Sequence, residues 1–135
     1  FYGPDMRPSL ATSVFLRALL NDKVIHIHGD GQQTRCYTHV DDVGQGILCI
    51  LESEENGVFN IAGEEEVSVL ELIEIIAAIT NKTPQLHFVD DRFGQIRKSK
   101  ISSNKLKRLG WQPAFTLHSG LLSCMAGSSV ARVLM

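Results

Sequence analysis

The sequence predicts an α/β protein in which short strands alternate with amphipathic helices. Two observations carry this prediction. Apolar residues recur at helical spacing in several segments, the clearest of which begins with a capping box at Ser68 and Glu71. Short runs of β-branched and aromatic residues lie between these segments and end at turn signals. The 135 residues suffice for one domain with a modest core.

The first part of the chain predicts one helix and two strands. Residues 9–21 carry apolar side chains at i, i+3, i+4, i+7 and i+8, and Pro8 fits a helix start. Residues 24–28 predict a short strand that stops at 29–31, Gly-Asp-Gly, and residues 34–40 alternate as a second strand. The glycine-rich connection between the two strands predicts a hairpin.

The middle of the chain predicts two helices and two strands. Residues 41–51 form the first of these helices, and the two aspartates at its start suit the positive end of the helix dipole. Residues 57–61 are mostly apolar and predict a buried strand. The helix that follows Ser68 has an inward stripe of Val, Leu and Ile, and residues 86–89 predict another strand.

The last part of the chain is less regular. Residues 90–100 are charged and predict a loop, and residues 102–109 predict a small helix that stops at a glycine. The final helix is expected to begin at Thr116. Residues 127–135 have no polar complement to their apolar side chains, so we expect an irregular tail there.

The charge balance argues against two broad classes of partner. Thirteen Lys and Arg against fifteen Asp and Glu give a formal charge of −2 at pH 7. A general nucleic-acid or membrane surface draws most of its affinity from a basic excess, which this chain lacks. No apolar run approaches the roughly 20 residues needed to span a bilayer. A local anion site remains compatible with this balance, because a few convergent arginines suffice.

The cysteines and histidines predict neither a disulfide framework nor a metal site. Cys36, Cys49 and Cys124 lie far apart, and an odd number without CxxC spacing suits a reducing compartment. We therefore expect a cytoplasmic protein. His26 and His28 fall on one strand face, but no second pair of ligands accompanies them at zinc-binding spacing.

Three short blocks hold residues suited to binding an anion. Arg35 follows the Gly-Asp-Gly turn, and Arg92 and Arg97 lie on either side of Gly94 in the charged loop. A guanidinium chelates phosphate oxygens with a fixed fork of donors. Asn60 ends an apolar run before a glycine, where α/β folds place ligand groups. Taken singly, each arginine also fits a solvated surface, and Asn60 also fits an amide that bonds turn backbone.

The order of the motifs along the chain adds a resemblance. The series resembles the carboxyl-terminal part of the NAD-dependent epimerase/dehydratase family, which are extended short-chain dehydrogenases acting on nucleotide sugars. The resemblance covers residues 1 to about 126. The motifs that carry it are Tyr2-Gly3-Pro4, Gly29-Asp30-Gly31-Gln32-x-Thr34-Arg35, Val40-Asp41-Asp42-Val43, Phe59-Asn60-Ile61-x-Gly63, Ser68-Val69-x-Glu71-Leu72, Arg92-x-Gly94-x-x-Arg97 and Leu109-Gly110-Trp111-x-Pro113.

This resemblance implies a fold and a division of labour. Residues 1–126 would form the small mixed α/β substrate-binding lobe of such an enzyme, with 127–135 as an irregular tail. The Rossmann half, which binds NAD and supplies a Tyr-x-x-x-Lys catalytic pair, would be absent. Neither Tyr2 nor Tyr37 has a lysine four positions on. The chain begins with Phe, and we expect it to be a piece of a longer parent enzyme. We expect this parent to be a homodimer.

The resemblance also implies roles for individual residues. Arg35 and Arg97, together with Arg92, would bind the diphosphate of a nucleoside-diphosphate sugar. Asn60 would position these arginines or touch the ligand. His28 would lie beside the nucleotide base. No catalytic, cofactor-binding or metal-binding residue is expected in this chain.

A departure from the family's loop sequence and an alternative function leave the function of the chain open. The family usually has Arg-Pro-Gly-Asp where this chain has Arg92-Phe93-Gly94-Gln95, so the loop loses the stiffness of proline and one acidic side chain. A non-catalytic relative that binds RNA or a protein partner through the same surface is the alternative. Balanced charge and few aromatic residues speak against RNA binding by stacking. The sugar, the base and the choice among epimerisation, dehydration and decarboxylation stay undetermined by these residues.

Overall fold

The computed structural model describes residues 1–126, and the tail predicted at 127–135 lies outside the described residues. Helices and strands alternate along the described part, so the predicted mixed α/β class is confirmed. The elements are α1 (Ala11–Leu20), β1 (Ile25–His28), β2 (Thr34–Cys36), α2 (Val40–Glu52), β3 (Glu66–Ser68), α3 (Val69–Thr80), β4 (Leu86–Val89), α4 (Asn104–Lys107) and α5 (Leu117–Ala126).

The strands pair in two separate two-stranded sheets. β1 pairs in parallel with β4, so that Ile25 lies opposite Leu86 and His28 lies opposite Val89, and β2 pairs antiparallel with β3. The hairpin predicted between the first two strands is therefore wrong. The turn at residues 29–31 exists, and both of its glycines have positive φ, but it sends β2 away from β1 into the other sheet. β3 has only three residues, too few to show a period of two in the sequence.

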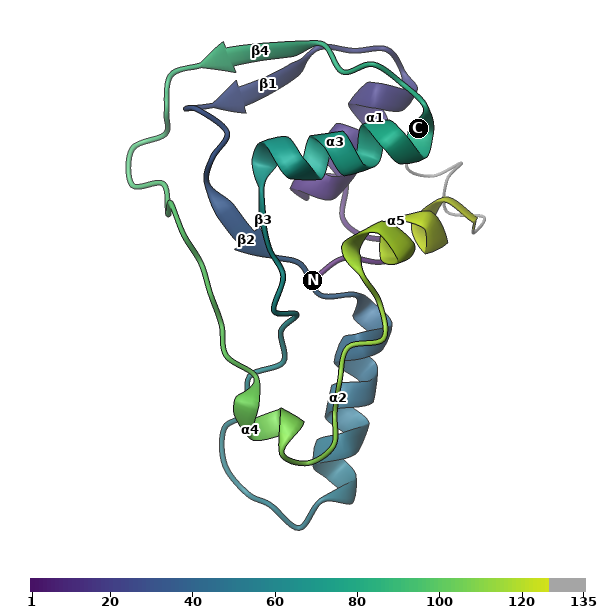
Figure 1. The fold of residues 1–135 in the computed structure, drawn as a ribbon, viewed down its shortest axis with the longest axis vertical. Coiled ribbons are helices and arrows are strands. Elements are labelled where there is room, and N and C mark those ends of the chain that lie inside the picture. Colours follow the sequence, from purple (N-terminus) through teal and green to yellow (C-terminus); the bar gives the residue numbers. More distant parts are fainter. Residues whose placement is uncertain (127–135) are drawn as a thin grey trace.

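The helix α3 forms as its sequence predicts. The Ser68 hydroxyl accepts a hydrogen bond from the Glu71 backbone N–H at 3.1 Å, and the Glu71 carboxylate accepts one from the Ser68 N–H at 2.7 Å. The inward side chains Leu72, Ile73 and Ile76 are at most 1% exposed. They face α1, which lies behind α3 in Figure 1. The core cluster consists of Tyr2, Phe15, Leu16, Leu19, Ile25, Ile27, Val67, Leu72, Ile73, Ile76, Leu117, Leu121 and Cys124.

The strand predicted at residues 57–61 does not form. Val58 is 85% exposed, because this segment crosses the surface beside α4 instead of entering a sheet. Side chains bind its backbone where a strand partner would: Lys105 Nζ donates to the Val58 carbonyl at 3.2 Å. The buried Ser103 hydroxyl accepts from the Ala62 N–H at 2.8 Å and donates to the Ala62 carbonyl at 3.0 Å.

A buried carboxylate attaches α2 to the segment before α5. Asp42, in the first turn of α2, accepts hydrogen bonds from the backbone N–H groups of Ala114 at 2.7 Å and Phe115 at 3.2 Å. The Trp111 indole donates to the Asp42 carbonyl at 3.0 Å. In Figure 1, α2 and α4 occupy the end of the molecule opposite β1 and β4. The two ends are therefore built from different elements.

Candidate anion-binding site

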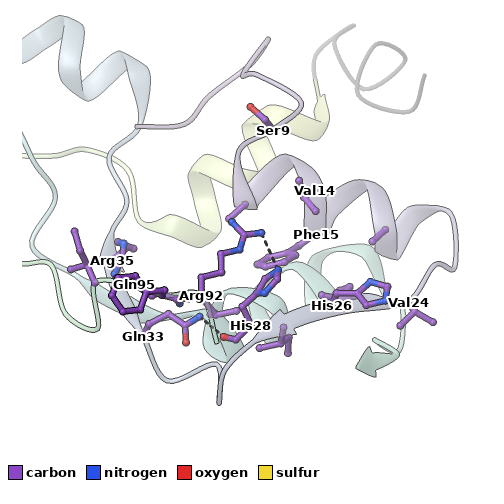
Figure 2. A pocket seen from close by; sticks show the side chains of 18 residues that line it. Ser9, Val14, Phe15, Val24, His26, His28, Gln33, Arg35, Arg92 and Gln95 are labelled. Carbon is purple, nitrogen blue, oxygen red and sulfur yellow. Dashed lines mark hydrogen bonds between the residues drawn. The ribbon is translucent and has the colours of Figure 1, made fainter. Parts of the chain in front are cut away.

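A hollow of about 770 Å³ lies between α1, β1 and the loop that follows β4. Its volume falls within the range of small-molecule sites, roughly 300–1,000 Å³. α1 contributes an apolar wall with Val14 and Phe15, and β1 contributes its whole length, ending at His28 (Figure 2). The predicted charged loop lines the opposite side with residues 92–96. The hollow thus brings together two segments that the sequence places far apart.

Two of the predicted arginines line this hollow. Arg35 extends from β2 and donates from its guanidinium to the Thr34 carbonyl at 2.7 Å. Arg92 enters from the loop, and its guanidinium lies 2.9 Å from Nε2 of His28 (Figure 2). No Asp or Glu is among the lining residues of the described chain. Two positive charges without a facing carboxylate make the hollow suitable for an anion.

Arg97 lies outside the lining of the hollow. Its guanidinium forms a two-pronged ion pair with Asp30, at 2.8 and 2.9 Å. Hydrogen bonding to Arg97 lowers the pKa of Asp30 to about 2, and a weaker contribution comes from the hydrogen bond that the Gln32 N–H donates. The same pair raises the pKa of Arg97 above its ordinary value. The carbonyl of Arg97 accepts from the Thr34 N–H at 2.9 Å, so the loop is joined to the start of β2.

The structure does not bring Asn60 to the hollow. Its side-chain amide donates to the Ser102 carbonyl at 3.3 Å, beside the start of α4. His28, in contrast, lies in the wall of the hollow between Gln33 and Arg92 (Figure 2). Of the five predicted site residues, three therefore share one site, and Arg97 and Asn60 contact other parts of the chain.

Gln33 is a site residue that the sequence reasoning overlooked. It is 6% exposed and lines the hollow, and its amide nitrogen donates to the His28 carbonyl at 3.1 Å. Its amide oxygen is buried and has no hydrogen-bond partner in the described part of the chain. One signal was available: Gln33 stands two positions before Arg35, in the approach to the predicted strand, where an extended chain would point both side chains the same way.

Comparisons with known proteins identify the family. A model of the family described as GDP-mannose 4,6 dehydratase matches residues 2–123. That match covers more than nine tenths of the described residues. The chain belongs to this family. Its members here are NAD-dependent epimerases, dehydratases and decarboxylases of nucleotide sugars.

Curated relatives extend the similarity over nearly the whole chain. The chain is 34% identical over 128 residues to an uncharacterized UDP-glucose epimerase of Bacillus subtilis, covering 93% of this chain and 40% of that protein. It is 31% identical over 126 residues to the low-salt glycan biosynthesis protein Agl12 of Haloferax volcanii, with 92% and 41% covered. The chain therefore spans about two fifths of the length of these relatives.

Solved structures of the family share the fold of this chain. UDP-glucose 4-epimerase of Thermotoga maritima, solved with UDP-glucose, matches with a TM-score of 0.88 and 31% identity, covering 99% of this chain and 44% of that one. UDP-glucuronic acid 4-epimerase of Bacillus cereus, solved with UDP-glucuronic acid and NAD, matches with a TM-score of 0.83 and 32% identity, covering 90% and 40%. The mixed α/β fold is thus part of the extended short-chain dehydrogenase fold.

Two other features are absent from residues 1–126. No group of three or more His, Cys, Asp or Glu side chains in this part could hold a metal ion. Among the helices of the same residues, none combines the length and apolar character that crossing a membrane requires.

Proposed function

We propose that this chain is the carboxyl-terminal, substrate-binding part of an NAD-dependent nucleotide-sugar epimerase, dehydratase or decarboxylase. Residues 1–126 would form the lobe that binds the diphosphate of a nucleoside-diphosphate sugar. The observation that carries the proposal is the 770 Å³ hollow, which is lined by Arg35 and Arg92 and by no acidic side chain of the described residues. Solved relatives of this chain bind UDP-sugars.

The geometry suggests how a diphosphate would be held. Arg35 and Arg92 enter the hollow from different elements, so that their guanidinium groups can bind one diphosphate from two sides. The apolar wall of α1, with Val14 and Phe15, offers a surface for a base or sugar ring. In this proposal Arg97 acts indirectly, by holding the turn at Asp30 in place through its ion pair.

Asn60 also acts indirectly in this proposal. Its hydrogen bond to the Ser102 carbonyl attaches the segment before β3 to the segment before α4. The loop that carries Arg92 leads directly into this second segment. Asn60 would therefore help to set the course of the chain that follows the loop.

The cofactor and the chemical step are assigned to the rest of the parent enzyme. The glycine turn at 29–31 opens a strand, whereas a dinucleotide-binding turn opens a helix whose N-terminus holds the pyrophosphate, so these residues do not fit NAD. Burial raises the pKa of the Tyr2 and Tyr37 hydroxyls, so both stay protonated near neutral pH and neither is ready to take a substrate proton. NAD and the group that removes a substrate proton would be supplied by the remaining part of a homodimeric parent.

The three cysteines suit the expected cytoplasmic location of such an enzyme. Cys36, Cys49 and Cys124 are free thiols in the structure. Free thiols are typical of reducing compartments such as the cytoplasm.

The proposed grip is tested by calorimetric titration of the 135-residue chain with UDP. Arg35→Ala and Arg92→Ala are each expected to weaken binding about tenfold to a hundredfold, the size of a charged hydrogen bond to a partly buried anion. Arg108→Ala, on the exposed end of α4 and away from the hollow, is the matched control and should bind as the unmodified chain does.

Two results would overturn this assignment. Unchanged UDP affinity in the double variant of Arg35 and Arg92 would show that these arginines do not bind the diphosphate. Strongly salt-dependent binding of RNA, with no binding of UDP, would instead support the non-catalytic alternative.

A further inference from the structure

His28 uses both nitrogens of its ring on neighbouring groups. Nδ1 lies 3.3 Å from the Asp90 carbonyl oxygen, and Nε2 lies 2.9 Å from a guanidinium nitrogen of Arg92. A carbonyl oxygen only accepts and a guanidinium only donates. Nδ1 must therefore carry the proton, and Nε2 must be the acceptor. The two contacts together define one neutral tautomer of His28.

This arrangement leaves His28 without a free nitrogen for a ligand. Within residues 1–126, the bond to His28 is the one hydrogen bond of the Arg92 guanidinium. Arg92 is otherwise a long, exposed side chain that would lose rotamer freedom on binding an anion. An acceptor that orients the guanidinium before the anion binds reduces this loss of rotamer freedom. The ring of His28 thus orients the Arg92 guanidinium. It affects a ligand in the hollow only through this arginine.

The backbone of His28 is itself held on both sides. Its carbonyl accepts from the buried Gln33 amide at 3.1 Å. In the parallel sheet His28 lies opposite Val89, and the next residue, Gly29, donates its N–H to the Val89 carbonyl at 3.0 Å. The ring therefore projects into the hollow from a fixed position (Figure 2). A fixed ring is a suitable support for a flexible arginine.

We propose that His28 is a positioning residue, whose neutral ring accepts a hydrogen bond from Arg92 and orients that guanidinium toward the bound diphosphate. This inference rests on the proposed function and refines it: His28 supports the anion grip and does not read the base by hydrogen bonds. Glutamine keeps an acceptor where Nε2 stands, whereas phenylalanine keeps the ring shape without it. Asparagine is too short to reach Arg92.

The first test compares UDP affinities of variants of the 135-residue chain by calorimetry. His28→Phe and His28→Asn are expected to bind UDP about tenfold more weakly, and His28→Gln within about twofold of the unmodified chain, since only Gln restores the charge-assisted bond. Equal weakening by all three would contradict the proposal, because the acceptor would then be irrelevant. Full affinity of His28→Phe would contradict it as well.

The second test needs no ligand. In ¹⁵N spectra the Arg92 guanidinium should give slowed rotation and resolved Nη protons in the unmodified chain and in His28→Gln, and should lose both in His28→Phe; Arg92→Lys assigns the signals. Identical guanidinium spectra in all His28 variants would overturn the positioning role. Failure of Arg35→Ala and Arg92→Ala to weaken UDP would overturn the proposed function separately, and absence of UDP binding by the unmodified chain would contradict both.

Discussion

The two ends of this molecule are held together by different interactions. We call α1, β1, α3, β4 and α5 the core part, and α2, Ser103, α4 and the segments 53–65 and 108–116 the anchored part. The core cluster takes none of its members from α2 or α4 within residues 1–126. In the anchored part, α2 exposes about half or more of Ile47, Leu48 and Leu51. Buried polar side chains such as Asp42 and Ser103 bind the backbone there, beside the separately buried Leu106 and Trp111.

The difference shows which part of the chain the candidate site depends on. The lining residues come from α1 and β1 with the residues just before them, the β2 strand and its approach, the start of α3 and the loop after β4, and none comes from the anchored part. Burial of apolar area is non-directional, whereas the bonds of Asp42 and Ser103 require specific backbone positions. A change in the anchored part should therefore alter stability with little effect on the site.

The largest expected effect separates two isoleucines. Ile76→Ala in α3 removes a side chain that is 0% exposed and should lower the free energy of unfolding by about 2–5 kcal/mol. Ile47→Ala in α2 removes one that is 48% exposed and should cost less than about 1 kcal/mol. Denaturant unfolding followed by circular dichroism measures both. Equal losses would break the distinction between the two parts.

A smaller effect tests the anchored part itself. Asp42→Ala leaves the N–H groups of Ala114 and Phe115 without their acceptor and should cost about 2–3 kcal/mol of unfolding free energy. Asp41→Asn, at the neighbouring exposed carboxylate, is the matched control and should change it by less than about 0.5 kcal/mol. Below its melting temperature, Asp42→Ala should still bind UDP with normal affinity. A large loss of UDP affinity in that variant would show that the two parts are coupled.

The smallest effect concerns the ion pair beside the hollow. Because Arg97 lowers the pKa of Asp30 from 3.8 to about 2, the folded carboxylate contributes stability above pH 3.8. That contribution is lost as the pH falls from 3.8 through about 2. Both side chains are more than half exposed, so the contribution is small and decreases with salt.

Carboxyl-carbon NMR titration measures this pair directly. Arg97→Gln should raise the pKa of Asp30 back toward its ordinary value, whereas Lys98→Gln, which removes the neighbouring cation paired with Glu66, should leave it unchanged. An Asp30 titration that stays the same in Arg97→Gln would exclude the ion pair as the cause.

Local signals in the sequence predicted the helices better than the strands. The capping box of Ser68 and Glu71 depends on residues three positions apart, and it forms as predicted. The partner of β1 is β4, and nothing near residues 24–28 specifies a strand some 60 positions away. The strand predicted from the apolar run at 57–61 is wrong for a similar reason. The side chains that bind the backbone there, Lys105 and Ser103, lie more than 40 positions along the chain.

The candidate site was only partly predictable for the same physical reason. Residue type and a preceding turn marked Arg35 as an anion ligand, and the loop of Arg92 was recognised by its charge. The partners that distinguish the two loop arginines are distant: His28 lies 64 positions from Arg92, and Asp30 lies 67 positions from Arg97. No spacing rule could tell which arginine would line the hollow and which would be paired with a carboxylate.

The separation of the two halves of the hollow has a consequence for folding. Since β1 and the loop after β4 are joined only by a long excursion through α2 and α3, the hollow is complete only when His28 and Arg92, which are 64 positions apart, have come together. An anion bound there is released whenever the chain unfolds. At a hundred times its dissociation constant, such a ligand raises the free energy of unfolding by about 2.7 kcal/mol. A ligand bound there should therefore make the chain more resistant to proteolysis of its unfolded form.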